Sequence, residues 1–208
     1  MKILDINTWN RKQHFNHFNA LSDPYFGVTI PFNVTKAYQF SKENNISFFG
    51  KYLHDCMKAI NSIENFKYRI ENDEIVVHDV INASATLMRN DKTFGFSFIN
   101  FNEDLKQFIN NINKEKERIE NTGALYPPQN TLDCIHCSAM PWFNSTGHKE
   151  PVSGQKESVP KLAYSKVIEQ NGELLMNVSI NVSHALVDGY HVGLFSEAFQ
   201  NNLNNKSF

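Results

Sequence analysis

Residues 174–183 restrict the possible fold more than any other stretch of this chain. Apolar and polar side chains alternate along them, as LLMNVSINVS, which is the pattern of a strand with one well-buried face. Residues 190–203 follow almost at once, and their apolar side chains recur at the spacing of a helix that buries one side. A strand that leads so directly into a helix predicts a sheet with a helical layer packed against it.

The remaining segments extend this plan. Helices are expected over residues 11–18, after an N-capping Ser47, and from Leu105 to a C-terminal Gly123. Strands are expected at 26–32, 66–70, 75–78, 84–88, 94–99, 132–139 and 159–168. Because proline donates no ladder hydrogen bond, the first of these is expected to break at Pro31. We predict a two-layer α/β (α+β) domain spanning residues 1–208, with a large, mostly antiparallel or mixed sheet packed against helices.

Composition excludes several classes of protein. The 208 residues are 41% apolar and 20% charged, which suits a globular core, and 17 phenylalanines can fill that core or line an apolar pocket. The net charge is −2 with no basic run, so nucleic acid is not an expected partner. Neither a signal-like apolar run at the N-terminus nor a membrane-spanning run is visible, and the expected location is the cytoplasm.

The clearest chemical signal is HALVDG at 184–189, between the strand and the last helix. A histidine at a strand end can project into a cleft, and imidazole exchanges protons near neutral pH. Asp188 lies four residues on, before a glycine that permits a tight turn. From this pattern alone, a catalytic histidine and a structural His-Asp pair are equally good interpretations.

Several other segments match in order and spacing. The pattern HxxxDG, continued by YHV, resembles the signature of the chloramphenicol acetyltransferase family. Further segments are also similar to segments of this family. They are WNRKQHF at 9–15, DPYFG at 23–27, TF at 93–94 with QF at 107–108, and SAMPW at 138–142. The agreement runs from about residue 5 to residue 203, and several motifs in the right order are far more specific than one.

The resemblance implies a transfer of acetyl from acetyl-CoA to a hydroxyl of chloramphenicol, which inactivates the antibiotic and confers resistance. His184 would be the general base in a ternary-complex mechanism without an acyl-enzyme. Ser138 would donate a hydrogen bond to the oxyanion, and Asp188 would pair with Arg11 to hold the active-site backbone rather than relay protons.

The resemblance also implies how ligands and subunits are arranged. Phe18, Phe26 and Phe94 would line the acceptor pocket, and Trp142 would contact coenzyme A. The protein would be a homotrimer, with His184 of one subunit facing a pocket built largely by the next. No metal is implied.

This chain departs from the family pattern at four places. Ser183 stands where a second histidine is common, Ala163 replaces a threonine that supports an active-site water, and Val167 replaces a tyrosine near the adenine of coenzyme A. Residues 144–158 are polar and contain no aromatic residue, although the family's acceptor pocket draws aromatic and apolar side chains from this region. An acceptor alcohol or thiol other than chloramphenicol therefore stays open as an alternative.

Two other interpretations stay open. The acyl-transfer core of dihydrolipoyl acyltransferases carries a similar motif, and a non-catalytic binding protein could keep the fold. The C-x-x-C pair Cys134 and Cys137 resembles half of a zinc site, but cysteines three apart on a strand point to opposite faces. We therefore expect no metal at this pair.

Overall fold

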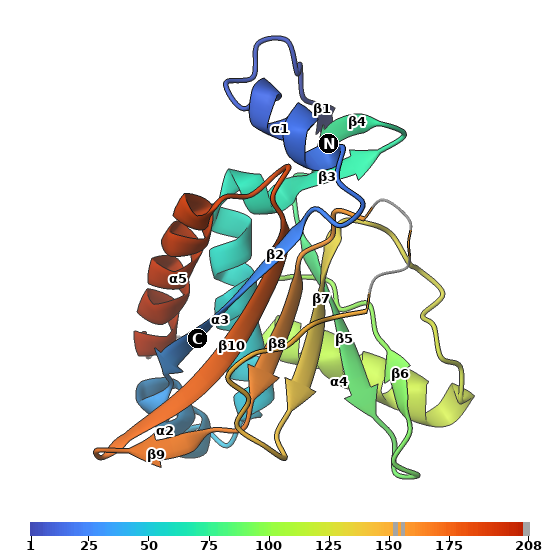
Figure 1. The fold of residues 1–208 in the computed structure, drawn as a ribbon. Helices are drawn as coiled ribbons and strands as arrows, with labels where there is room; N and C mark the ends of the chain where they lie inside the picture. Colours follow the sequence, from blue (N-terminus) through green and yellow to red (C-terminus); the bar gives the residue numbers. More distant parts are fainter. Residues whose placement is uncertain (152–153, 155–156, 206–208) are drawn as a thin grey trace.

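A mixed sheet of seven strands forms the centre of the molecule in the computed structural model (Figure 1). The structure describes residues 1–208 except 152–153, 155–156 and 206–208. The six strands along the sheet are, in spatial order, β2 (Tyr25–Asn33), β10 (Glu173–Ser183), β8 (Lys161–Ser165), β7 (Cys134–Met140), β5 (Asn82–Met88) and β6 (Phe94–Phe96). The short strand β9 (Ile168–Gln170) pairs with β10. Strand β7 runs parallel to β8 and β5, and the other pairs are antiparallel, so the predicted mixed α/β architecture is confirmed.

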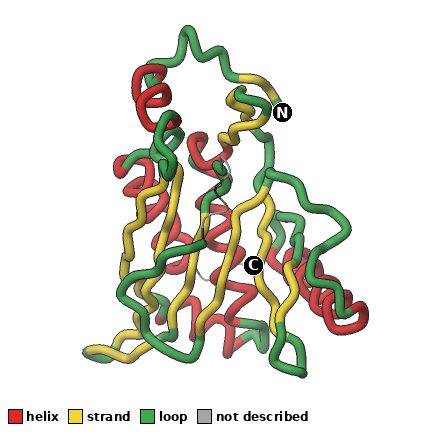
Figure 2. Tube along the Cα trace, turned by 45° about the vertical axis from the view of Figure 1, so that its right-hand side comes forward, coloured by secondary structure: helices red, strands yellow, loops and turns green. Residues whose placement is uncertain are grey.

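Helices cover one side of this sheet (Figures 1 and 2). They are α2 (Thr35–Glu43), α3 (Phe48–Ser62), α4 (Leu105–Thr122) and α5 (Gly189–Asn204). The predicted end signals are present: Ser47 Oγ accepts from Gly50 N at 3.2 Å, and Gly123 ends α4 with φ of 65°, which favours glycine. None of the helices in the described part of the chain is long and apolar enough to cross a membrane.

Alternation along β10 separates the two faces of the sheet. Met176, Val178, Ile180 and Val182 are almost fully buried in the core against the helices. The intervening asparagines and serines point to the opposite face, which the helices leave uncovered. This uncovered face is hereafter called the polar face.

A second, three-stranded sheet and helix α1 (Lys12–Asn19) lie at the end of the molecule where β10 stops (Figure 1). The strands are β1 (Lys2–Ile3), β4 (Glu74–Val77) and β3 (Tyr68–Glu71), with the 3₁₀ helix η1 (Glu64–Lys67) before β3. The buried guanidinium of Arg69 joins this sheet to the main one by donating to the carbonyl of Leu132 at 2.7 Å, just before β7. The end of the molecule that carries His184 is thereby held to the main sheet.

The expected break at Pro31 is wrong. Strand β2 continues through Pro31, which pairs with Asn177 of β10. Because β2 is an edge strand with β10 as its neighbour on one side, the missing N–H of proline can face away from the ladder. Helix α2 and strand β9 were not expected from the sequence.

Candidate active site

The turn between β10 and α5 holds His184. The carbonyl of Ser183 accepts from the N–H groups of Leu186 and Val187, each at 3.0 Å, which closes the turn. The N–H of His184 donates to the carbonyl of Pro24 at 2.8 Å and ties the turn to the segment before β2. The backbone of His184 is therefore held from two sides.

The ring of His184 lies between two phenylalanines. The ring of Phe18 stacks on it with centroids 3.9 Å apart and planes 5° apart, and the ring of Phe26 lies 4.6 Å away at 46°. About a third of the His184 side chain, 33%, stays exposed. The imidazole is thus fixed by apolar contact on its faces and open at an edge, which is what a general base needs.

Arg11 binds the same turn through its guanidinium. It forms an ion pair with Asp188, and its Nη2 donates to the carbonyls of His184 at 3.1 Å and Ala185 at 3.4 Å. The Arg11 side chain is buried, and this burial lowers the pKa of its guanidinium from the usual value. A planar, five-donor group can serve a carboxylate and two carbonyls together, as an ammonium cannot.

Asp188 is close to the imidazole without being bonded to it. Its Oδ1 lies 3.2 Å from His184 Nδ1, yet neither atom makes a hydrogen bond within the described residues. The N–H of Asp188 instead donates to Nδ1 of His191 at 2.9 Å at the start of α5. The geometry therefore joins Asp188 to Arg11 and the helix start more firmly than to the ring of His184.

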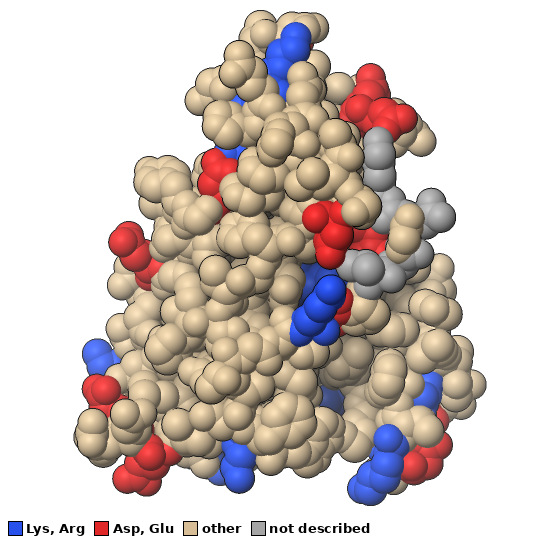
Figure 3. Space-filling model, in the orientation of Figure 1, with Lys and Arg blue, Asp and Glu red and all other residues tan. Residues whose placement is uncertain are grey.

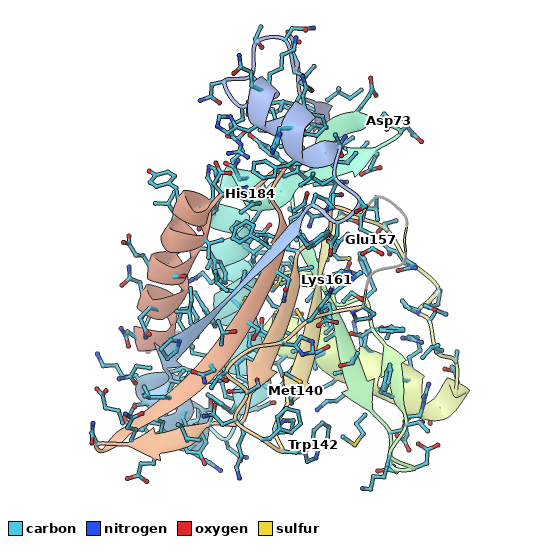
Figure 4. The ribbon with its side chains drawn as sticks, viewed as in Figure 1. Asp73, Met140, Trp142, Glu157, Lys161 and His184 are labelled. Carbon is cyan, nitrogen blue, oxygen red and sulfur yellow. The ribbon has the colours of Figure 1, made fainter. Side chains whose placement is uncertain are left out.

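Ser138 lies far from His184 in the same chain. It pairs with Ala163, and Ala163 pairs with Ser179 of β10, while His184 is five residues further along the chain. At about 3.3 Å per strand residue and about 4.8 Å between strands, the Cα atoms of Ser138 and His184 are about 19 Å apart. In Figure 4 His184 is at one end of the sheet, and Met140, two residues after Ser138, is near the other.

The phenylalanines expected to share one pocket also divide into two groups. Phe18 and Phe26 contact His184, whereas Phe94 lines a cavity of about 370 Å³ together with Ser138. This cavity opens on the polar face of the sheet. We name these two groups of residues the histidine half-site, around His184, and the serine half-site, around Ser138.

Trp142 lies at a third place, after the end of β7. It is 62% exposed and lines a cavity of about 570 Å³ whose walls are mostly apolar. Val167 lines the same cavity, and Lys116 and Lys166 supply positive charge. An apolar wall with cations beside it suits a long ligand that carries phosphates.

Two further departures from the family pattern lie on the polar face. Ala163 is buried directly beside Ser138 and offers no hydroxyl there. Ser183 is also buried, and its Oγ has no hydrogen-bond partner among the described residues. The polar loop 144–158 is described apart from residues 152–153 and 155–156.

Sequence reasoning missed three residues of the serine half-site. His136, Glu150 and Lys161 line the cavity of Ser138. The signal was present for two of them: His136 is two residues before Ser138 on β7 and Lys161 pairs with it from β8, so all three share one face. Glu150 comes from the loop and had no such periodic signal.

The two cysteines of β7 lie in different clusters, although Cys137 also borders the cavity of Ser138. Cys134 is buried in a small cluster with Phe98 and Val159, whereas Cys137 is buried in the main core. Both thiols are free, and burial raises the pKa of Cys134 to about 11. Among the described residues, no group of three or more potential metal ligands is found.

This chain is similar in sequence to known proteins. A family profile described as chloramphenicol acetyltransferase matches residues 1–200. A chloramphenicol acetyltransferase of Bacillus pumilus is 27% identical over 199 residues, which cover 94% of this chain and 90% of that protein. Chloramphenicol acetyltransferase 3 of Escherichia coli is 25% identical over 208 residues, covering 97% of this chain and 96% of that protein.

Solved structures agree with the sequence matches. The structure of a chloramphenicol acetyltransferase superposes with a TM-score of 0.85 at 25% identity, covering 97% of this chain and 99% of the other. A dihydrolipoamide acetyltransferase of Azotobacter vinelandii gives a TM-score of 0.70 at 14% identity, covering 93% of this chain and 86% of the other. This second likeness shows a shared fold.

Proposed function

Because this chain belongs to the chloramphenicol acetyltransferase family, we propose that it is an O-acetyltransferase that moves an acetyl group from acetyl-CoA to a hydroxyl of a small alcohol. His184 takes the proton of that hydroxyl, and the alkoxide attacks the thioester directly in a ternary complex. The C–S bond then breaks, and the leaving thiolate of coenzyme A takes the proton back from His184. The observation that carries this proposal is the His184 ring, which is clamped between Phe18 and Phe26 with an open edge. We propose that residues 1–208 form one catalytic domain.

Ser138 and Arg11 have different tasks in this proposal. Ser138 donates a hydrogen bond to the oxyanion that forms at the carbonyl under attack, a contribution of about 2.7–4 kcal/mol for such donors. Arg11 and Asp188 hold the turn, since the guanidinium binds the carbonyl of His184 itself. They fix the direction of the imidazole and do not move protons.

We propose that the active site forms between subunits of a homotrimer. A general base must lie within hydrogen-bond reach of the acceptor hydroxyl, and an oxyanion donor within about 3 Å of the carbonyl oxygen. Two side chains on Cα atoms about 19 Å apart cannot meet both conditions. A ring of three copies in head-to-tail contact can bring the histidine half-site of one subunit against the serine half-site of the next.

Acetyl-CoA fits the cavity at Trp142. The cavity of about 570 Å³ offers an apolar wall, and Lys116 and Lys166 are suited to phosphates. Trp142 would contact the coenzyme, and Val167 would leave the adenine without an aromatic neighbour at that position. We also propose the cytoplasm as the location of the protein, because acetyl-CoA is made and consumed there.

Chloramphenicol is the first acceptor to test, with Phe94, Phe18 and Phe26 forming the pocket across the interface. Its acetylation would inactivate the antibiotic and confer resistance. A different acceptor alcohol or thiol is the second candidate, and the polar side chains beside Ser138 favour it. A non-catalytic binding protein is the third, and it would bind ligands without turnover.

The test is the initial rate of coenzyme A release from acetyl-CoA in the presence of chloramphenicol, for the wild type and His184→Ala. A rate that depends on chloramphenicol and disappears in the variant supports both the chemistry and the acceptor. Turnover with other alcohols alone supports the chemistry with a different acceptor. Tight ligand binding without turnover for any alcohol or thiol would contradict the proposal that the protein is an enzyme.

A further inference from the structure

The serine half-site contains a polar wall that the proposed chemistry does not require. The cavity of Ser138 shares Glu150 and Lys161 with a neighbouring hollow of about 310 Å³ on the same face of the sheet. In Figure 3 most of this face is uncharged, and a small group of charged atoms lies near its middle, above a hollow. An acceptor that lies in the cavity of Ser138 would contact these groups.

One wall of the cavity is aromatic. Phe94 and Phe96 of β6 meet edge to face with centroids 5.5 Å apart, and Tyr126 stacks on Phe96 at 5.4 Å and 24°. Phe94 is 48% exposed and Tyr126 is 60% exposed, so their ring faces are available to a ligand. An exposed ring face suits an aryl group or the C–H face of a saturated ring.

The other wall offers hydrogen bonds from neighbouring strands. His136 of β7 pairs with Ser84 of β5 on one side and with Lys161 of β8 on the other. Solvent reaches His136 through the open cavity. The atoms packed around the imidazole desolvate it and lower its pKa, and the charge of Lys161 lowers that pKa further. A neutral imidazole can donate at one nitrogen and accept at the other.

Charges of both signs lie on this wall. Lys161 is 6% exposed, and its Nζ lies 2.6 Å from Glu157 Oε2 and 3.1 Å from the carbonyl of Pro151. Figure 4 shows Lys161 and Glu157 together on this face. Glu150 Oε1 lies 2.8 Å from His148 Nε2, and a carboxylate has a second oxygen that can accept from a hydroxyl. The neighbouring hollow is lined by two lysines and two carboxylates, Lys149, Lys161, Asp23 and Glu150.

A wall with charges of both signs favours one class of acceptor over its competitors. Because lysines and carboxylates both line this region, a single charge on the acceptor would meet groups of both signs and gain little net attraction. A wholly apolar acceptor would bury these polar atoms without hydrogen-bond partners, which is unfavourable for each group. An aromatic wall facing a hydrogen-bonding wall suits a molecule with C–H faces and hydroxyl edges.

We propose that the acceptor is a neutral polyhydroxylated compound, a sugar or cyclic polyol, which lies on Phe94 and Tyr126 and is recognised through its hydroxyls by Glu150 and His136. This inference rests on the proposed function and names the acceptor of the same site. Glu150 and His136 are specificity residues in it, and Lys161 positions the wall through Glu157 and Pro151.

The first experiment compares acceptors of four kinds in the coenzyme A release assay. They are the methyl glycosides of glucose, galactose and mannose, chloramphenicol as a neutral aryl alcohol, choline as a cationic alcohol, and glycerate as an anionic one. We expect at least one glycoside to give the highest kcat/KM, with all transfer lost in His184→Ala. A higher kcat/KM for chloramphenicol, choline or glycerate than for every glycoside would overturn the acceptor class and leave the acetyltransferase proposal standing.

Binding is measured separately by ligand-observed NMR, so that the two proposals can fail independently. If glycosides bind but no acceptor of any kind is acetylated, the proposed function fails and the recognition of sugars stands. If no glycoside binds to the wild type, the inference about the acceptor is wrong whatever the enzyme does with the other alcohols.

Variants at Glu150 separate hydrogen bonding from charge. Glu150→Leu should lower kcat/KM for the preferred glycoside about 10- to 100-fold, because it removes an acceptor of hydroxyl hydrogen bonds. Glu150→Gln keeps an acceptor oxygen without the charge and should stay within a few-fold of the wild type. Glu169→Leu, an exposed carboxylate on β9, is the matched control and should change nothing. An equal loss in Glu150→Gln and Glu150→Leu would mean that charge is recognised and would overturn a neutral acceptor.

Discussion

Mixed oligomers of two inactive chains provide the sharpest test of where the active site is assembled. One chain carries His184→Ala and keeps Ser138, and the other carries Ser138→Ala and keeps His184. If each site takes its histidine from one subunit and its serine from the next, chains mixed at random in equal amounts contain complete sites in about a quarter of all positions. The structure motivates this test, because the two half-sites of one chain are about 19 Å apart.

The expected rates differ enough to distinguish the two arrangements. His184→Ala alone should be inactive, and Ser138→Ala alone should retain about 10⁻² to 10⁻³ of the wild-type kcat, the usual loss of one oxyanion donor. The two chains are co-expressed with different affinity tags, and mixed oligomers are purified by using both tags in turn. These oligomers should recover tens of per cent of the wild-type rate with an acceptor that the wild type uses. Each variant is also mixed with itself as a control.

The proposal of an interfacial site is contradicted if the doubly tagged oligomer is no faster than half the rate of Ser138→Ala. That rate is the average expected when each site acts within its own chain, because the His184→Ala chains contribute none. Light scattering on the same sample gives the oligomeric state. A monomer with full activity would refute the same reasoning by a different route.

Further predictions concern stability. Arg11→Ala should lower the free energy of unfolding by about 2–3 kcal/mol in denaturant titrations, because it leaves a carboxylate and two carbonyls of the turn without their shared donor; a variant that unfolds like the wild type yet has no turnover would contradict a holding role. Burial lowers the pKa of His54 below its usual 6.5, so its contribution to stability is present above pH 6.5 and is lost as the pH falls below that value. His54→Gln should therefore lose less stability than the wild type between pH 7.5 and pH 5.5, and an identical pH profile would remove His54 as the cause. Gly95→Ala should cost about 1–3 kcal/mol, because its new Cβ would lie 3.0 Å from Ile119 Cγ2 and 3.2 Å from the carbonyl oxygen of Ala124, whereas Gly193→Ala meets no atom within 4 Å on an exposed turn of α5 and should gain about 0.5–1 kcal/mol; thermal melts of both should move in opposite directions.

Local patterns predicted the architecture well because each signal acts over a few residues. The alternation of 174–183 became β10, Ser47 begins α3, and Gly123 ends α4. The break at Pro31 was wrong because a residue's place at the edge of a sheet is decided by strand order, which local sequence does not contain. Local sequence also does not contain the separation, within one chain, of Phe94 beside Ser138 from Phe18 and Phe26 beside His184.

The candidate site was predictable where residues are close along the chain or share a motif, as His184 and Asp188 do. The contact of Arg11 with the turn depended on a resemblance, since 173 residues separate Arg11 from His184. Glu150 could not be found at all, because a loop residue has no periodicity that reports what it faces.

The contacts of Asp188 limit which substitutions this sequence can accept during evolution. Its N–H binds His191 at the first turn of α5, its carbonyl accepts from Val192, and its carboxylate binds Arg11 from the other end of the chain. Selection for folding alone should therefore retain Asp188. The same selection should tolerate substitution of His184, because its imidazole makes no hydrogen bond within the described structure. In a library sorted only for soluble expression, position 184 should accept many residues and position 188 few, and a second sort for turnover should restore the histidine.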